Sequence, residues 1–178
     1  LTNDFIELFN RSTQPVSLNG WSVQYASSTG SFTQATPLSG TLAPGAYYLV
    51  QESGGAAGVV LPAPDATGAI AMAAGAGKVI IAQTAAPLGV ACPSGAIAVD
   101  IVSYGSGNPC GTFAPTIGNT TAALRKHAGC TYTASPLADF ATGAPAPRNS
   151  ASPTRSCVPG PLDHVSLTGT PQVLVGST

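Results

Sequence analysis

Residues 3–25, NDFIELFNRSTQPVSLNGWSVQY, contain the strongest strand and turn signals in the chain. Within this stretch, residues 4–9 are rich in aromatic and branched side chains and are followed by turn-forming residues, which predicts a β-strand. Because side chains alternate along a strand, Ile6 and Leu8 share one face, and Phe5, Glu7 and Phe9 share the other. Neither face is polar. We therefore expect both faces to be covered, or one of them to contact something outside the domain.

The second half of this stretch places an Asn-Gly pair between two apolar runs. Asn19-Gly20 suits a type I′ turn, because both central residues of that turn need positive φ, and this predicts a β-hairpin. Trp21, Val23 and Tyr25 then alternate with polar residues, which is typical of a strand with one buried face. Trp21 is the only tryptophan in the chain, and the predicted core anchors are Ile6, Leu8, Trp21 and Val23.

Several further segments are predicted to be short strands. The firmest are 46–51 and 99–105, a short strand is expected at 121–125, and weaker strand signals lie at 31–33, 69–72 and 78–83. Pro44-Gly45 fits the centre of a type II turn, where glycine tolerates positive φ. Glycines at 68, 75 and 77 argue against a helix in the Ala-rich region. The pattern predicts an all-β fold.

The composition limits the classes of function. Charged residues make up 7% of the 178 residues, and the net charge is −1; an ordinary soluble domain has roughly 25% charged residues. There is no basic field to attract nucleic acid, so no nucleic-acid partner is expected. No apolar run approaches the roughly 20 residues needed to cross a bilayer, so no membrane span is expected.

The four cysteines, Cys92, Cys110, Cys130 and Cys157, are widely spaced and include no CxxC pair. Zinc sites present closely paired ligands, so two disulfides are the better interpretation, and they imply an oxidising, extracellular location. Four cysteines allow three pairings. We favour Cys92–Cys110 and Cys130–Cys157, because each closes a Gly/Pro-rich loop between neighbours, although the sequence alone does not decide among the three.

Five phrases of the chain, in order, resemble the lamin-tail domain family, an immunoglobulin-like module of nuclear lamins and of secreted bacterial proteins, with the bacterial secreted branch the most similar. They are IEL-x-N with P-V-x-L-x-G-W at 6–21, a Pro-Gly turn with YYLV at 44–50, VD-x-V-x-YG at 99–105, the segment ending at Arg125, and the phrase from Phe140 to Asn149. The resemblance implies an immunoglobulin-like β-sandwich. The family usually opens with one more hydrophobic strand, and this chain begins after it.

The organisation that follows is an immunoglobulin-like domain over residues 1–149, a Pro/Ser linker over 150–161 and an extended, strand-like tail over 162–178. The tail is too short to form a domain of its own. It either begins a further module or pairs with a sheet. The candidate residues for strand donation are Val165, Leu167, Val173 and Val175.

Catalytic groups are sparse. A hydrolase would need His127 or His164 as its base, and no serine stands in a Gly-x-Ser-x-Gly phrase. The carboxylates are scattered singly, and Asp4 and Glu7 lie on opposite faces of one strand. We therefore predict no enzyme activity, no catalytic residue, no cofactor and no metal site. Asn10 and Asn119 each open an N-glycosylation sequon and are predicted sites of glycan attachment.

The leading hypothesis is a non-catalytic, secreted module with a structural or binding role at the cell surface or in the extracellular space, whose partners are proteins. A second hypothesis is a self-assembling filament or surface-layer subunit, in which the tail of one copy fills the sheet edge left by the missing first strand of another. A third is an accessory domain of a secreted hydrolase or nuclease, because family members occur beside such enzymes.

Overall fold

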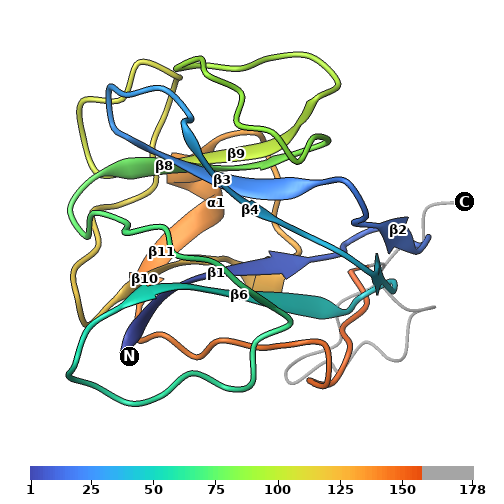
Figure 1. The fold of residues 1–178 in the computed structure, drawn as a ribbon. Helices are drawn as coiled ribbons and strands as arrows, with labels where there is room; N and C mark the ends of the chain where they lie inside the picture. Colours follow the sequence, from blue (N-terminus) through green and yellow to red (C-terminus); the bar gives the residue numbers. More distant parts are fainter. Residues whose placement is uncertain (158–178) are drawn as a thin grey trace, which may run out of the picture.

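The computed structural model describes residues 1–157, and nearly all of its regular secondary structure is short strands joined by loops (Figure 1). In chain order the strands are β1 (Asn3–Phe9), β2 (Val16–Ser17), β3 (Ser22–Ser27), β4 (Gln34–Pro37), β5 (Thr41–Leu42), β6 (Tyr47–Gly54), β7 (Ala66–Thr67), β8 (Gly77–Ala82), β9 (Ala98–Tyr104), β10 (Ala122–Arg125) and β11 (Phe140–Gly143). One short 3₁₀ turn, His127–Gly129, and one short helix, α1 (Pro136–Asp139), lie between β10 and β11.

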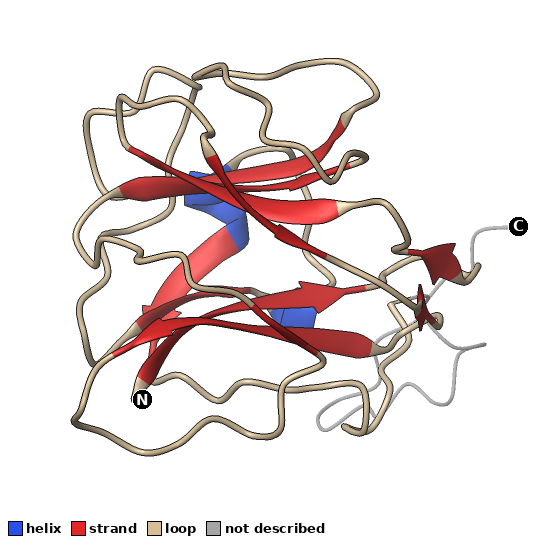
Figure 2. Ribbon diagram, in the orientation of Figure 1, coloured by secondary structure: helices blue, strands red, loops and turns tan. Residues whose placement is uncertain are grey.

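The strands form two facing layers (Figure 2). One layer is a four-stranded sheet in the order β4-β3-β8-β9, and the facing layer contains the sheet β1-β6-β7. β10 pairs with β11, and the short β2-β5 pair closes one end of the sandwich. The predicted all-β sandwich is confirmed.

Both faces of β1 are partly covered by other parts of the chain. It pairs antiparallel with β6, and Ile6 is buried in a core cluster that includes Val23 and Val50. On its other face, the ring of Phe9 stacks on Tyr47 with centroids 4.8 Å apart. Of the predicted core anchors, Ile6 and Val23 are buried, and Leu8 and Trp21 are partly buried against the same cluster.

The predicted hairpin around Asn19-Gly20 is wrong. β2 pairs with β5, whereas β3 pairs with β4 and β8, so the strands on either side of the turn belong to different sheets. The turn itself is present, because the Trp21 amide donates to the Leu18 carbonyl at 3.0 Å. Gly20 has a φ of 79°, but Asn19 does not adopt positive φ, which is the pattern of a type II turn. That turn does not match the twist of a tight hairpin, and it carries the chain across the sandwich.

Two of the weaker strand predictions are also displaced. The strand expected at 31–33 forms instead at β4, and residues 69–72 form no strand. In the latter segment, the amide of Ile70 donates to the Glu52 carboxylate at 3.0 Å, and the amide of Met72 donates to Asp4 at 2.8 Å. Side chains therefore satisfy backbone groups that a neighbouring strand would otherwise bind.

The polar face of β3 is buried, which the alternating sequence does not reveal. Ser22 and Gln24 are fully buried. The segment that follows β8 covers them: Gln24 donates to the Ala86 carbonyl at 2.9 Å and accepts from the Leu88 amide at 3.0 Å. Because each of these polar groups has a partner, their burial is compatible with a stable core.

The chain after β11 wraps back around the sheet that contains β1. Ser150 binds the Asp65 carboxylate, and the Arg155 amide donates to the Gly45 carbonyl at 2.8 Å. Residues 150–157 of the predicted linker thus lie on the domain. The rest of the linker and the predicted tail, with Val165, Leu167, Val173 and Val175, lie outside the described residues. Over residues 1–157, no helix has the length and apolar character needed to cross a membrane.

The Gly45 turn gives a direct test of this wrapping. Gly45 has a φ of 69°, and a Cβ there would clash with the Arg155 carbonyl. Gly20 has a similar φ of 79°, but a Cβ there would meet nothing within 4 Å. We expect Gly20→Ala to lower the unfolding free energy by about 1 kcal/mol, from backbone strain alone, and Gly45→Ala to lower it by roughly 2–3 kcal/mol. Urea denaturation of both variants measures the difference, and equal losses would contradict the docking of Arg155.

Candidate functional site

Two disulfides tie loops of the sandwich together. Cys92 pairs with Cys110 and Cys130 pairs with Cys157, each with Cα atoms 5.3 Å apart, which is the pairing that the sequence favours. The second bond fixes the end of the described chain next to the 3₁₀ turn. No free cysteine remains to act as a nucleophile or thiolate ligand, because all four are paired.

Lys78 is buried beneath the first disulfide. Its Nζ donates to the carbonyls of Gly30 at 2.7 Å and Ala91 at 2.9 Å, and lies 3.8 Å from the Sγ of Cys110. Burial lowers the pKa of Lys78. No carboxylate forms an ion pair with it among the described residues. Lys78 thus connects three loops through two backbone carbonyls and the disulfide.

Arg125 lies between two carboxylates from different elements. Its Nη2 donates to Asp100 of β9 at 2.5 Å, and its Nη1 lies 3.4 Å from Asp139 of α1. The guanidinium also stacks 4.4 Å from the centroid of the Phe140 ring. These groups, with Tyr132, line a small cavity of about 150 Å³. The arrangement pairs charges with each other and leaves no free acid and base side by side.

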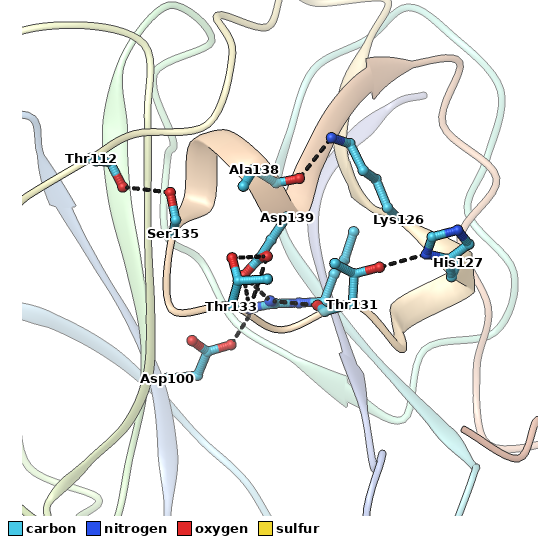
Figure 3. A network of polar contacts seen from close by, with 10 residues as sticks. Asp100, Thr112, Lys126, His127, Thr131, Thr133, Ser135, Ala138 and Asp139 are labelled. Carbon is cyan, nitrogen blue, oxygen red and sulfur yellow. Dashed lines mark hydrogen bonds and ion pairs between the residues drawn. The ribbon is translucent and has the colours of Figure 1, made fainter. Parts of the chain in front are cut away.

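Asp139 is the most constrained acid of this cluster (Figure 3). Its oxygens accept from the Thr133 amide at 2.9 and 3.0 Å and from the Thr133 hydroxyl at 2.7 Å. Burial alone would raise the pKa of Asp139, but these hydrogen bonds and the charge of Arg125 outweigh it and lower the pKa. For Asp100 the balance is reversed, because burial raises its pKa more than Arg125 lowers it.

His127, a residue considered as a catalytic base, lies on the exposed side of this cluster. Its Nδ1 is 2.7 Å from the hydroxyl of Thr131, and the neighbouring Lys126 donates to the Ala138 carbonyl at 2.6 Å (Figure 3). Both contacts hold the segment between β10 and β11 in place. The second candidate base, His164, lies outside the described residues. Within residues 1–157, no group of three His, Cys, Asp or Glu side chains could hold a metal ion.

Arg148 forms polar contacts with Glu7 and Tyr47, which lie 141 and 101 residues away in sequence. Its Nη2 donates to Glu7 Oε1 at 2.6 Å, its backbone amide donates to Glu7 Oε2 at 2.7 Å, and its Nη1 donates to the Tyr47 hydroxyl at 2.7 Å. The guanidinium carbon lies 3.8 Å above the Tyr47 ring. Burial alone would lower the pKa of Arg148, but Glu7 and Tyr47 outweigh it and raise the pKa. This clamp attaches the segment after β11 to β1 and β6.

Glu52 is a buried acid that the sequence reasoning did not single out. Its Oε2 accepts from Ile70, whereas its Oε1 has no hydrogen-bond partner among the described residues. Burial raises the pKa of Glu52, and this outweighs the lowering by the hydrogen bonds from Thr36 and Ile70. A shifted acid is often catalytic. Here the side chain is only 1% exposed, so no substrate could reach it.

The two predicted glycosylation sites lie in different environments. Asn10 is buried, and its Nδ2 donates to the carbonyls of Gln14 at 2.8 Å and Leu42 at 2.9 Å. Its Oδ1 accepts from the amide and hydroxyl of Ser12. Because a glycan needs an accessible Nδ2, the structure removes Asn10 as an acceptor in the folded protein and gives it the role of organising the turn after β1. Asn119 is exposed in a loop, and its glycosylation remains a prediction.

A large groove opens between the layers of the sandwich. It has a volume of about 1430 Å³ and is bordered by residues 1–12, which include β1, and by residues 117–125, which include β10. Apolar side chains of the four-stranded sheet, including Val23, Val79, Ile81 and Val102, line its interior. The groove exceeds the roughly 300–1,000 Å³ of ordinary small-molecule pockets. Its lining is mainly apolar, and the ion pairs Glu7–Arg148 and Asp100–Arg125 lie at its border.

The family model described as the Lamin Tail Domain matches residues 1–131 of this chain. The chain therefore belongs to the lamin tail domain family, and its sandwich is of the immunoglobulin-like kind. No curated protein and no solved structure matches the chain.

The acidic residues of two family phrases form ion pairs in the structure. Glu7 of the IEL phrase binds Arg148, and Asp100 of the VD phrase binds Arg125. The sequence reasoning quoted these phrases but did not predict the pairs. One sequence feature could have indicated these pairs: each acid is a single charged residue between apolar neighbours in a strand, in a chain that has few charged residues.

Glu52 yields a pH-dependent prediction. Because its folded pKa is raised above the ordinary value of 4.5, the folded state binds the proton more tightly than the unfolded state. The stability from this proton is present below about pH 4.5 and is lost as the pH rises through the folded pKa. We expect Glu52→Gln to remove this loss, so that its unfolding free energy increases relative to wild type between pH 4.5 and 8. Urea denaturation across this range measures it.

Asp139→Asn provides the control with the opposite sign. The folded pKa of Asp139 is lowered below 3.8, so its contribution is present above that pH and is lost as the pH falls through the folded pKa. The deficit of Asp139→Asn relative to wild type should therefore be largest at neutral pH and should shrink in acid. Parallel pH profiles for the two variants would contradict both assignments.

Proposed function

We propose that this chain is an extracellular, non-catalytic module with a structural or binding role and with protein partners. The observation that carries the proposal is how the charged residues are used. Glu7, Asp100, Arg125, Asp139 and Arg148 are paired with one another across distant segments. Catalysis instead requires an acid, base or nucleophile that is free to face a substrate.

Two disulfides support the extracellular location. Such bonds persist in oxidising compartments and are rare where glutathione and thioredoxin keep thiols reduced. The low charge supports a protein partner over nucleic acid, because a net charge of −1 supplies no field that would attract phosphates.

A second candidate function is self-assembly into a filament or surface layer. It is favoured by the sheet edges of β1 and β10 along the groove, because an unpaired strand edge is a template for a strand of another chain. The low charge also reduces the repulsion that would keep copies apart.

The proposal predicts where the native protein is found and in which redox state. Fractions of the source cells, probed with an antibody against the chain, should contain it at the cell surface or in the medium. Mass spectrometry should find no free thiol and should identify linked peptides for Cys92–Cys110 and Cys130–Cys157. Reduction of both bonds should lower the unfolding free energy by about 2–4 kcal/mol or more. A cytosolic protein with four free thiols would refute the extracellular location.

A further inference from the structure

We propose that the groove between β1 and β10 is an acceptor site for a β-strand, and that residues 165–175 of the same chain occupy it. The proposal goes beyond the function proposed above, because it concerns how the sandwich is completed and holds for any location of the protein. Four observations support it: the strand edges that border the groove, the apolar side chains inside it, the point at which the described chain ends, and the pattern of the tail sequence.

Within residues 1–157, the strand edges that border the groove have no strand partner. Every residue from Leu1 to Ser12 borders it, including those from both faces of β1, as expected when a strand presents its edge and not one face. β1 is bonded to β6 on one side, and the described chain places no strand on the other. β10 is likewise bonded only to β11 in this part of the chain. A row of free amide and carbonyl groups of this kind is the recognition surface for an added strand.

The side of the groove that β8 and β9 form is apolar and incompletely covered. Val79 and Ile81 of β8 pack against the main core cluster yet remain partly exposed, as does Trp21. Val102 of β9 packs against a second core cluster and is also partly exposed. A strand with one apolar face would bury these side chains, and each square ångström of apolar surface removed from water contributes about 25 cal/mol.

The sequence of the tail matches this requirement. Residues 165–175 read VSLTGTPQVLV. Positions 165, 167, 169, 171, 173 and 175 are all apolar or glycine, whereas the positions between them are polar except for Leu174. Such a period of two places one face toward a core and the other toward water. The segment has no charged residue, so it carries no ionised side chain into the groove.

The described chain ends within reach of the groove. Cys157 is bonded to Cys130, and the adjacent Gly129 lies against the Phe9 ring. Phe9 and Gly129 both border the groove, so the chain is anchored at the Phe9 end of β1. Residues 158–164 can span up to about 23–25 Å when extended, about the length of β1 itself. The tail can therefore run antiparallel to β1, and this tether gives it a millimolar effective concentration, which favours the chain's own tail over that of another copy.

Fluorescence of Trp21 tests the proposal, because it is the only tryptophan and it borders the groove. The test variant of the full chain carries Val165→Asp and Leu167→Asp, which place charges on the apolar face of the tail. The matched control carries Ser166→Asp and Thr168→Asp, which place the same charges on its polar face. We expect acrylamide quenching of Trp21 to be low in wild type and control, and to rise about twofold or more in the test variant, because buried carboxylates expel the strand.

Two results would overturn the proposal. Equal quenching in all three proteins would show that the tail does not cover Trp21. Loss of the wild-type shielding on dilution, with a matching fall in mass by light scattering, would show that the strand comes from a second copy. Shielding that is independent of concentration in a monomer, and that is lost only in the test variant, supports occupation by the chain's own tail. Far-UV circular dichroism of each variant verifies that the sandwich stays folded.

Discussion

The clamp between Arg148 and Glu7 determines how β1 is built into the sandwich. Three donors of Arg148 bind Glu7, a fourth binds Tyr47, and the two ends of this contact are 141 residues apart in sequence. A bidentate arginine–carboxylate pair fixes geometry as well as charge. It presses the segment after β11 against the outer face of β1, while β6 binds one edge. The remaining edge and the inner face of the strand open onto the groove.

Other charged residues of the described chain also join segments that are distant in sequence. Arg125 joins β9 to α1 through two carboxylates, Lys78 joins three loops beneath a disulfide, and Asp65 binds both β6 and Ser150. In a chain with 7% charged residues, most of the charge in the described part is thus committed to long-range ties. This explains how a sandwich rich in alanine and glycine, with few large aromatic side chains, keeps its layers together.

The sequence predicted the strands that have both a strong apolar pattern and clear turn signals, such as those at 4–9, 46–51 and 99–105. The strand predictions were wrong where groups distant in sequence form the hydrogen bonds to the backbone. In residues 69–72, the amides of Ile70 and Met72 donate to the carboxylates of Glu52 and Asp4, and the segment forms no strand. Asn19-Gly20 forms a turn whose flanking strands pair elsewhere. The pairs Glu7–Arg148 and Asp100–Arg125 could not be predicted, because local patterns carry no information about which distant charges meet. The burial of Asn10 was likewise not predicted, because residues 10–12 match a glycosylation sequon and such sequons are expected in exposed loops.

The claim that charges in the family phrases act as structural ties is tested most directly by a double-mutant cycle on Glu7→Gln and Arg148→Met. Urea denaturation of the wild type, both single variants and the double variant gives the coupling free energy. We expect a coupling of about 1–3 kcal/mol, as for residues in direct contact, and additivity within about 0.5 kcal/mol for the control pair Glu7→Gln and Lys126→Met. A coupling near zero for Glu7 and Arg148 would contradict the account.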